Sequence, residues 1–302
     1  MHIRNLLIPL LAIPSTLAVS LPIRVVSFNI RYAATSLETN ELSWWNILCP
    51  FNHDLCRDYH LCSTLGNYVY DVDTAVIGLQ EVLSSQLSDV LNNLGSTWAH
   101  IGVGRDDGDS SGEFSPIIYD TDVLDVVFSE TKWLSPTPDV VSYGWGAGSR
   151  RIVTIGVFEH KATGKRFIHA NTHLDNVSQQ ARVEGIKVVV SQIESVQATY
   201  GPLAVTLTGD FNSDPSGSDD AYATLEGLDY VTDLWNTATH LGTNQLTYTG
   251  FSDTGVSKID FIWYGPNGDG LYTVNQTEIV GNKVDGVYIS DHRMVYGDLI
   301  LN

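Results

Sequence analysis

Basic residues are scarce in this sequence. Its 302 residues include 16 lysines and arginines against 35 aspartates and glutamates, which gives a formal net charge of −19. A surface with this charge repels polyanions, so broad non-specific binding of nucleic acid is disfavoured. The charge alone does not exclude a nuclease, because a few cationic groups or a bound metal ion can reverse the field inside one cleft.

Cysteine is also rare, and the three copies lie close together at Cys49, Cys56 and Cys62. No histidine follows at zinc-finger spacing, which argues against a structural zinc site. In an oxidising compartment, three cysteines predict one disulfide and one remaining thiol, and the sequence does not select the pair. We interpret residues 43–64 as a loop that this disulfide clips locally.

Beyond the N-terminus, no apolar run is long enough to span a bilayer. Residues 1–20 have the features of a signal peptide, with a mostly apolar run over Leu6–Ala18 and small residues up to Ser20. A buried first helix or strand is the weaker alternative, because a strand-like run follows at once. We therefore expect a secreted, soluble monomer of residues 21–302. Its two N-glycosylation sequons lie at Asn176 and Asn275.

The rest of the chain alternates between strand-like and helix-like patterns without a repeat or a linker. Hydrophobic residues make up 43% of the chain, which is enough for a large core and excludes general disorder. We therefore predict one α/β domain in which sheet exceeds helix. The predicted strands cover 23–28, 74–79, 167–172, 203–208, 259–264 and 294–301, with β character at 126–128 and 140–141. The predicted helices cover 84–94, 178–199 and 219–225.

Polar residues end or interrupt many of these apolar strands. Buried without partners, such groups would cost several kcal/mol each, so their repeated placement predicts that they converge on one polar cleft. Isolated members such as Asn29 or Asp291 would more often be turn or cap residues, but the whole set argues against coincidence. The set consists of Asn29, Glu81, His173, Asp210, Asn212, Asp260, Asp291 and His292.

The spacing of these residues adds detail. In an extended segment, residues two apart share a face, so Asp210 and Asn212 point together. Neighbours face apart, so we expect Asp260 from an adjacent strand, rather than Asp291, to orient His292. Hard oxygen ligands such as Glu81 suit Mg²⁺, with Mn²⁺ or Ca²⁺ as alternatives, better than zinc. Carboxylates, a metal ion and histidines together fit hydrolysis of a phosphoester.

Six segments of the sequence resemble the endonuclease/exonuclease/phosphatase (DNase I-like) superfamily, in the family's order and across the whole predicted mature chain. This resemblance implies a four-layer αββα sandwich, in which helices flank two packed, mixed β-sheets. The cleft is then expected at one edge of the sandwich. The segments are Ser27–Arg31, Ile77–Val82, Asn171–Asp175, Thr208–Asn212, Lys258–Ile262 and Ser290–His292.

The resemblance also implies roles for the cleft residues. Glu81 would be the principal metal ligand, with Asn29 and Asp291 nearby. Asp210 would orient or deprotonate the attacking water. Asn212 and His173 would stabilise the phosphoryl oxygens. His292, held by Asp260, would contact the phosphate and stabilise charge in the transition state.

A narrower likeness, to a large bacterial and fungal branch of the superfamily, lies in Ile101–Gly108, Gly112–Ile117 and nearby segments. It implies a set of substrate-side residues. Two of its arginines are candidates to clamp a phosphate or sugar bidentately, and salt bridges within an acidic surface are an equally good interpretation. The set is Arg105, Glu113, Tyr119, Arg151 and Arg182. Trp44 and Trp45 depart from this branch, and we favour a hydrophobic plug over a lid.

These features favour a secreted, divalent-metal-dependent phosphodiesterase acting on a small phosphorylated or sugar-phosphate substrate. A DNase I-like nuclease is the first alternative, although the densest basic cluster is only Lys161, Lys165 and Arg166. A sphingomyelinase-like role would require an exposed apolar hairpin, and the sequence offers no clear candidate. A glycoside hydrolase would leave both histidines unexplained. A catalytically inactive binding protein would have lost some of the cleft residues.

Overall fold

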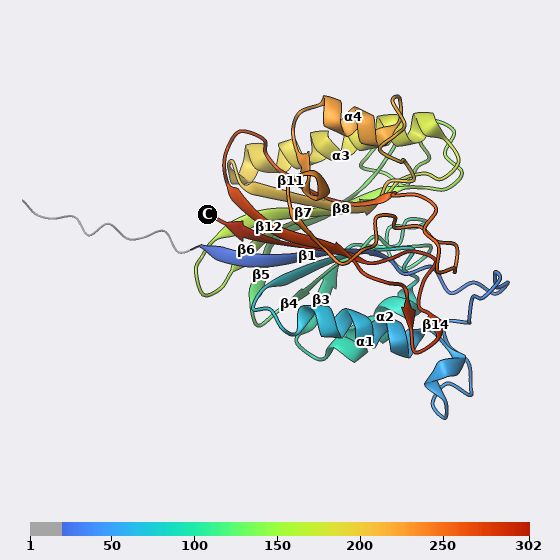
Figure 1. The fold of residues 1–302 in the computed structure, drawn as a ribbon. Helices are drawn as coiled ribbons and strands as arrows, with labels where there is room; N and C mark the ends of the chain where they lie inside the picture. Colours follow the sequence, from blue (N-terminus) through green and yellow to red (C-terminus); the bar gives the residue numbers. More distant parts are fainter. Residues whose placement is uncertain (1–19) are drawn as a thin grey trace, which may run out of the picture.

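The computed structural model describes residues 20–302, and the predicted signal peptide lies almost entirely outside them. Two β-sheets form the centre of the molecule (Figure 1). The first has the order β10-β12-β15-β1-β2-β4-β3, and the second has the order β5-β6-β7-β8-β11-β9. A separate hairpin pairs β13 (Lys283–Val284) with β14 (Val287–Tyr288).

The strands of the first sheet are β1 (Leu21–Asn29), β2 (Ala75–Gln80), β3 (Trp98–Ile101), β4 (Ile117–Asp120), β10 (Thr239–Leu241), β12 (Tyr272–Ile279) and β15 (Val295–Leu301). Those of the second are β5 (Leu124–Trp133), β6 (Ile152–His160), β7 (Arg166–His173), β8 (Ala204–Asp210), β9 (Thr232–Asp233) and β11 (Asp260–Gly265). The helices are α1 (Asp58–Val69), α2 (Ser84–Leu94), α3 (Gln179–Tyr200) and α4 (Ala221–Gly227), with 3₁₀ turns η1 (His53–Leu55) and η2 (Leu234–Asn236).

Strand periodicity explains the layers. Along β1, Val25 packs between the two sheets, whereas Val26 and Phe28 point outward into the cluster that α1 and α2 cover. Helices α3 and α4 cover the outer face of the second sheet through a separate apolar cluster. Figure 1 shows the resulting helix–sheet–sheet–helix order. The predicted four-layer sandwich is confirmed.

The two sheets approach each other closely near the polar residues. A Cβ atom on Gly78 of β2 would overlap the side chains of Thr208 and Asn171 from the second sheet. Only glycine fits there, and Asn171 uses the space to accept a hydrogen bond from Gln80 at 2.8 Å. The carboxyl ends of β1, β2, β7 and β8 therefore lie close together.

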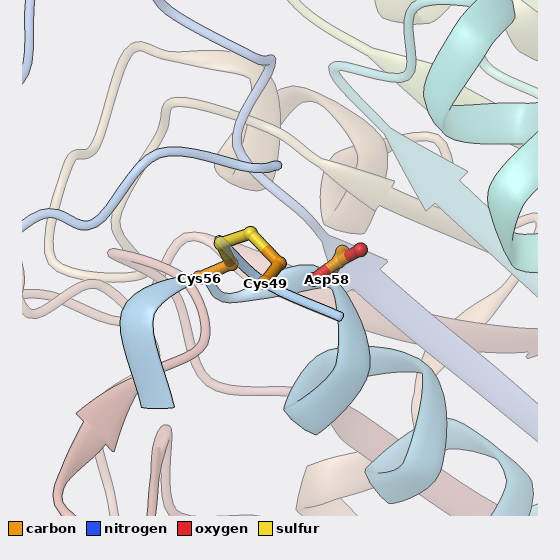
Figure 2. Close-up of side chains that lie close together, drawn as sticks. All are labelled: Cys49, Cys56 and Asp58. Carbon is orange, nitrogen blue, oxygen red and sulfur yellow. A yellow bond between two sulfur atoms is a disulfide. The ribbon is translucent and has the colours of Figure 1, made fainter. Parts of the chain in front are cut away.

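The cysteine segment differs from the prediction. Cys49 and Cys56 form the disulfide with a Cα–Cα distance of 5.9 Å, while Cys62 is buried and free. Residues 43–64 are not one loop, because α1 begins at Asp58 and buries Leu61 and Cys62 against the first sheet. Figure 2 shows Asp58 beside the disulfide. Because both sulfurs are bonded to each other, this group is not a thiolate metal site.

One further expectation fails. Val140 and Val141 lie in a turn between β5 and β6 and are exposed rather than part of a strand. The loop between β1 and α1 exposes Ile47 and Phe51, but it joins a strand to a helix and is not a hairpin. Within residues 20–302, no helix combines the length and the apolar character needed to cross a membrane.

Candidate active site

Strand register brings the polar strand ends together. Asn29 pairs with Gln80 across β1 and β2, and Asp210 pairs with both His173 and Asp260 across β7, β8 and β11. These ends line a cleft of about 460 Å³. Its wall is formed by Arg31, Tyr32, Glu38, Glu81, Arg105, Glu113, Ser149, Arg151, His173, Asn176, Asp210, Asn212, Tyr248, Ile259, Asp291 and His292.

Asp210 is the central carboxylate. Its Oδ2 accepts a hydrogen bond from Asn29 Nδ2 at 2.9 Å, and its Oδ1 accepts one from the backbone N–H of Asn212 at 2.9 Å. Its Oδ2 also lies 3.6 Å from His173 Nε2 and 3.7 Å from His292 Nε2. Burial, reinforced by the nearby Asp260 carboxylate, raises the pKa of Asp210 to about 7. Such a carboxylate is suited to accept a proton near neutral pH.

His292 is held by Asp260, as predicted, but not from an adjacent strand: Asp260 begins β11 of the second sheet, and His292 precedes β15 of the first. Its Nδ1 lies 2.8 Å from Asp260 Oδ2, and both residues are buried. Burial alone would lower the pKa of His292, but Asp260, Asp210 and Asp291 outweigh it and raise that pKa well above the usual value. The ring is therefore an imidazolium that points Nε2 toward Asp210. Ligand atoms of Asp210, Asp260 and His292 lie within 4.8 Å of one another, but the histidine occupies the position between the carboxylates.

His173 lies on the other side of Asp210. Asn212 Nδ2 lies 3.1 Å from His173 Nε2, so the ring nitrogen accepts from this amide. Burial, followed by the charges of Arg151 and Arg105, holds the pKa of His173 well below its usual value. The neutral ring then carries its proton on Nδ1, which has no hydrogen-bond partner and lies 3.8 Å from Glu113.

The predicted metal ligands lie on the same flank as His292. Glu81 Oε1 accepts from Asn29 Nδ2 at 3.1 Å, and Glu81 Oε2 accepts from the backbone N–H of Tyr32 at 3.1 Å. Burial and the neighbouring Glu81 charge raise the pKa of Asp291. Asn29 turns its amide nitrogen toward Glu81 and Asp210, while its oxygen accepts from the Arg31 N–H at 2.9 Å. In this geometry Asn29 bridges the two carboxylates.

The donor set fits a hard divalent cation. Two carboxylates repel each other where Glu81 and Asp291 meet, and a cation between them would remove that repulsion. The charge of the cleft also favours a bound cation, because five carboxylates and only three arginines line it. Such a cleft repels a phosphate unless a cation is also bound.

Three of the cleft residues have a left-handed backbone conformation. Arg31, Glu81 and Asn212 have φ angles of 57°, 61° and 48°, and each follows the end of β1, β2 or β8 by one or two residues. Non-glycine residues adopt this conformation at a cost of order 1–3 kcal/mol, and they persist in it where surrounding contacts fix them. Here the sharp turn brings each side chain to the cleft.

Two of the three arginines predicted on the substrate side, Arg105 and Arg151, line the cleft, and both are ion-paired. Arg105 binds Glu113 bidentately at 2.7 and 2.8 Å. Arg151 donates to Asp175 at 3.3 Å and to Asn176 Oδ1 at 2.9 Å. The salt-bridge interpretation is thus the one seen in the structure, and binding of a phosphate by these arginines stays a prediction.

Tyr119 and Arg182 are not brought to the cleft. The Tyr119 ring packs against Phe158 between the sheets, with ring centroids 5.4 Å apart. Arg182, on α3, binds Asp220 with its shortest contact at 2.6 Å. The basic cluster at 161–166 also lies away from the cleft, because it forms the β6–β7 turn at the opposite end of β7 from His173.

No protein-family model and no curated protein matches this chain, but solved structures do. An endonuclease/exonuclease/phosphatase family protein from Bacteroides thetaiotaomicron is similar over 94% of this chain and 99% of its own, with 28% identity and a TM-score of 0.78. A family protein from Bacteroides vulgatus shares 30% identity over 93% of this chain and 100% of its own, with a TM-score of 0.76. The chain belongs to the endonuclease/exonuclease/phosphatase family.

A third similar structure has a named activity. It is a mannosyl-6-phosphatase from Bacteroides thetaiotaomicron, with 30% identity over 92% of this chain and 99% of its own, and a TM-score of 0.76. As an endonuclease/exonuclease/phosphatase family member, this chain is a phosphoric ester hydrolase, as the sequence predicted.

Some cleft residues of this family member had no predicted role, notably Arg31 and Tyr248. Arg31 stands inside one of the family-like segments and pairs with Glu41 at 3.2 Å, so its position beside Asn29 was an available signal. Tyr248 lies on a loop outside these segments, and its ring lies 5.1 Å from that of His292. Nothing in the local sequence around Tyr248 indicates this contact.

Proposed function

We propose that this protein hydrolyses a small phosphorylated or sugar-phosphate substrate by in-line attack of a water molecule that Asp210 activates. The observation that carries the proposal is the placement of Asp210 between a charged and a neutral histidine, with a pKa of about 7. In the reaction, the water oxygen bonds to phosphorus as the bond to the leaving oxygen breaks, and the water proton passes to Asp210.

The remaining residues bind and orient the phosphoryl group. His292 carries its charge toward the phosphoryl oxygens, and Asp260 holds the ring in place. Asn212 directs its side-chain amide into the same region. Glu81 and Asp291 would hold a divalent cation, Mg²⁺ in our proposal, which neutralises charge on the phosphoryl and leaving oxygens when bound.

The size and charge of the cleft support a small substrate. Within the part of the chain that the structure describes, no lysine lines the cleft, and the densest basic cluster lies at the other end of β7. A nuclease needs cationic contacts to several phosphates beside the scissile one. The sugar phosphate named for one similar protein points in the same direction. We further propose secretion, which the Cys49–Cys56 disulfide supports.

The test uses protein stripped with a chelator and resupplied with Mg²⁺, Mn²⁺ or Ca²⁺. Substrates are bis-p-nitrophenyl phosphate, p-nitrophenyl phosphate, mannose 6-phosphate and plasmid DNA. We expect turnover to vanish on chelation and to return with metal, and the preferred substrate to distinguish diester, monoester and nuclease activity.

Glu81→Gln tests the assignment of the cation. It should raise the metal concentration needed for half-maximal activity by about tenfold or more, because it removes one charged ligand. Glu38→Gln is the matched control, since Glu38 also lines the cleft but pairs with Arg31 at 3.1 Å. Turnover that survives chelation, or folded protein without turnover under every condition, would contradict the proposal.

A further inference from the structure

A buried arginine that takes no part in the proposed reaction lies directly behind the cleft. Arg57 immediately precedes α1, and its side chain is fully buried. Its guanidinium donates hydrogen bonds to four backbone carbonyl oxygens. Nη1 reaches those of Ile30 at 2.6 Å and Ile289 at 3.4 Å, and Nη2 reaches those of Arg31 at 2.7 Å and Tyr32 at 2.9 Å. One side chain therefore joins two segments that lie far apart in the sequence.

The first of these segments, residues 30–32, also binds residues of the proposed cation site. The N–H of Arg31 donates to Asn29 Oδ1 at 2.9 Å, and the N–H of Tyr32 donates to Glu81 Oε2 at 3.1 Å. The C=O and N–H groups of a planar trans peptide unit point in opposite directions. Two successive peptide units therefore bind Arg57 through their oxygens and the cation site through their N–H groups. A shift of these units would move Glu81 relative to Asn29.

The second segment leads to the other proposed carboxylate ligand, Asp291. Ile289 stands two residues before Asp291, and its carbonyl oxygen accepts the longest of the four Arg57 hydrogen bonds. Ser290 lies between them and donates from Oγ to the carbonyl oxygen of Asn29 at 2.7 Å. Arg57 therefore bonds to both of the segments that meet at this contact. The spacing of the two carboxylate ligands depends on how these segments are held together.

The chemistry of this contact favours a guanidinium. Carbonyl oxygens that converge on one point repel each other, and a cation with several N–H donors offsets that repulsion. A guanidinium presents its donors in a rigid planar fork, so its two terminal nitrogens reach different peptide units at once. Burial lowers the pKa of Arg57 to about 10, so the group still carries its charge at neutral pH. Lysine would supply the same charge from a single nitrogen.

The chain around Arg57 is itself anchored outside the cleft. The Arg57 N–H donates to the carbonyl oxygen of Ser43 at 3.2 Å, and the preceding residue Cys56 is bonded to Cys49. Figure 2 shows this disulfide beside the start of α1. The buried Trp44 places its ring 5.3 Å from the guanidinium carbon of Arg57. Contacts outside the cleft therefore help to fix the position of the guanidinium.

We propose that Arg57 is a positioning residue for the divalent cation: by holding two backbone segments of the cleft wall, it sets the spacing of Glu81 and Asp291. This inference rests on the proposed cation site. Arg57 lies outside the cleft lining, so it acts on the affinity for the cation rather than on proton transfer at Asp210. A residue that only stabilises the fold would leave that affinity unchanged in the folded protein.

The experiment measures Mn²⁺ binding by the chelator-stripped full chain, without substrate, from the electron paramagnetic resonance signal of free Mn²⁺. Arg57→Lys keeps the buried charge but binds fewer carbonyl oxygens. We expect its Kd for Mn²⁺ to rise by about tenfold or more, as is usual when a group that orients metal ligands is changed. At saturating Mn²⁺, kcat should change by less than about threefold, because the reacting groups are unaltered.

Arg24→Lys is the matched control. Arg24 is also buried, donates to the carbonyl oxygen of Tyr68 at 2.8 Å and pairs with Asp298 at 2.7 Å. It lies near the start of β1, at the opposite end of that strand from Asn29. This variant should also lose thermal stability, but it should keep the wild-type Kd for Mn²⁺. A purely structural role of Arg57 predicts loss of stability alone in both variants.

Unchanged Mn²⁺ affinity in folded Arg57→Lys, or an equal rise of Kd in Arg24→Lys, would overturn the proposal. If Arg57→Lys does not fold, Cys49→Ser with Cys56→Ser replaces it, because this pair keeps Arg57 but frees the segment before it. We expect a several-fold rise of Kd in this pair, and the wild-type Kd would overturn the proposal. Wild-type protein that binds no Mn²⁺ would instead refute the cation site and, with it, this inference.

Discussion

The two flanks of the cleft place a histidine at nearly the same distance from Asp210, yet leave one ring neutral and the other positively charged. His173 Nε2 lies 3.6 Å from the Asp210 carboxylate and His292 Nε2 lies 3.7 Å away. On the arginine flank, burial together with Arg151 and Arg105 lowers the pKa of His173. On the carboxylate flank, Asp260 and its neighbours outweigh burial and raise the pKa of His292.

The difference shows that the groups behind each ring, rather than the shared carboxylate, set its charge. One flank then supplies a neutral ring and fixed guanidinium groups, and the other supplies an imidazolium and oxygen ligands. A phosphoryl group between them would meet positive charge from both directions once a cation is bound.

The largest effect should come from removing the carboxylate that both flanks share. Asp210→Asn is expected to lower kcat by about 10³-fold or more, because the water loses its proton acceptor. The same substitution should raise the thermal midpoint at pH 8. The folded-state pKa of Asp210 is raised to about 7, so the stability it contributes at low pH is lost as the pH rises through that value.

The matched control for this variant is Asp214→Asn. The pKa of Asp214 is lowered despite burial, through hydrogen bonds from Ser216 and Lys258, so its charged form stabilises the fold. That variant should keep its activity and melt slightly lower. Equal activity losses in the two variants would refute the central role of Asp210.

The next largest effect should come from removing the charge of Asp260, which makes the charge of His292 more like that of His173. Asp260→Asn keeps a hydrogen-bond partner for His292 but removes its charge, so the pKa of His292 should fall. We expect kcat to fall by about 10²-fold to 10³-fold and the alkaline limb of the pH profile to move to lower pH. Nuclear magnetic resonance titration of the ring measures the shift directly.

Asp233→Asn is the control for Asp260→Asn, because Asp233 is also buried and its partner Lys258 lies 3.0 Å away. It should reduce the free energy of unfolding by about 3–5 kcal/mol, as breaking a buried ion pair does. An unchanged His292 titration in Asp260→Asn would show that other groups set the ring's charge.

A smaller, graded effect is expected from pH. Below a midpoint near 7, kcat/KM should fall about tenfold for each pH unit, because protonated Asp210 does not accept a proton from water. A divalent cation bound nearby favours the ionised form, so the midpoint should move to lower pH as the cation approaches saturation. A flat profile between pH 5 and 8 would contradict this assignment.

The smallest effect should come from the arginine flank. Arg105→Lys keeps the charge but loses the bidentate geometry with Glu113, so KM should rise several-fold, by less than about tenfold, with kcat little changed. Arg182→Lys breaks a similar pair with Asp220 outside the cleft and should leave KM unchanged. A larger KM change in Arg182→Lys would restore its predicted substrate role.

The sequence predicted those parts of the structure that depend on local pattern. Helices α2 and α3 begin and end within one residue of prediction, and the polar strand ends do converge. Asp260 was correctly matched to His292, although the contact joins the two sheets rather than adjacent strands. Helix α1 was missed because clustered cysteines suggested a loop, although Leu61, Leu65 and Val69 recur at helical spacing.

Other features depend on contacts between distant segments. The Tyr119 side chain points between the sheets because Tyr119 pairs with Val76 of β2. The sequence alone does not give the register of this strand pair. The position of Tyr248 follows from a bridge to His292, 44 residues further along the chain. Likewise, the sequence could not identify Cys49 and Cys56 as the disulfide pair, because it did not show that Cys62 is buried in α1.

The pairing of β1 with β15 has a consequence for the order in which the enzyme is made. Ser27 of β1 pairs with Val295 of β15, so β1 lacks one of its two neighbours until the last strand has left the ribosome. The Asn29 that bridges Glu81 and Asp210 follows directly on this strand. Contacts between such distant segments form late and slowly. We therefore expect the cleft to assemble only after β15 has been made.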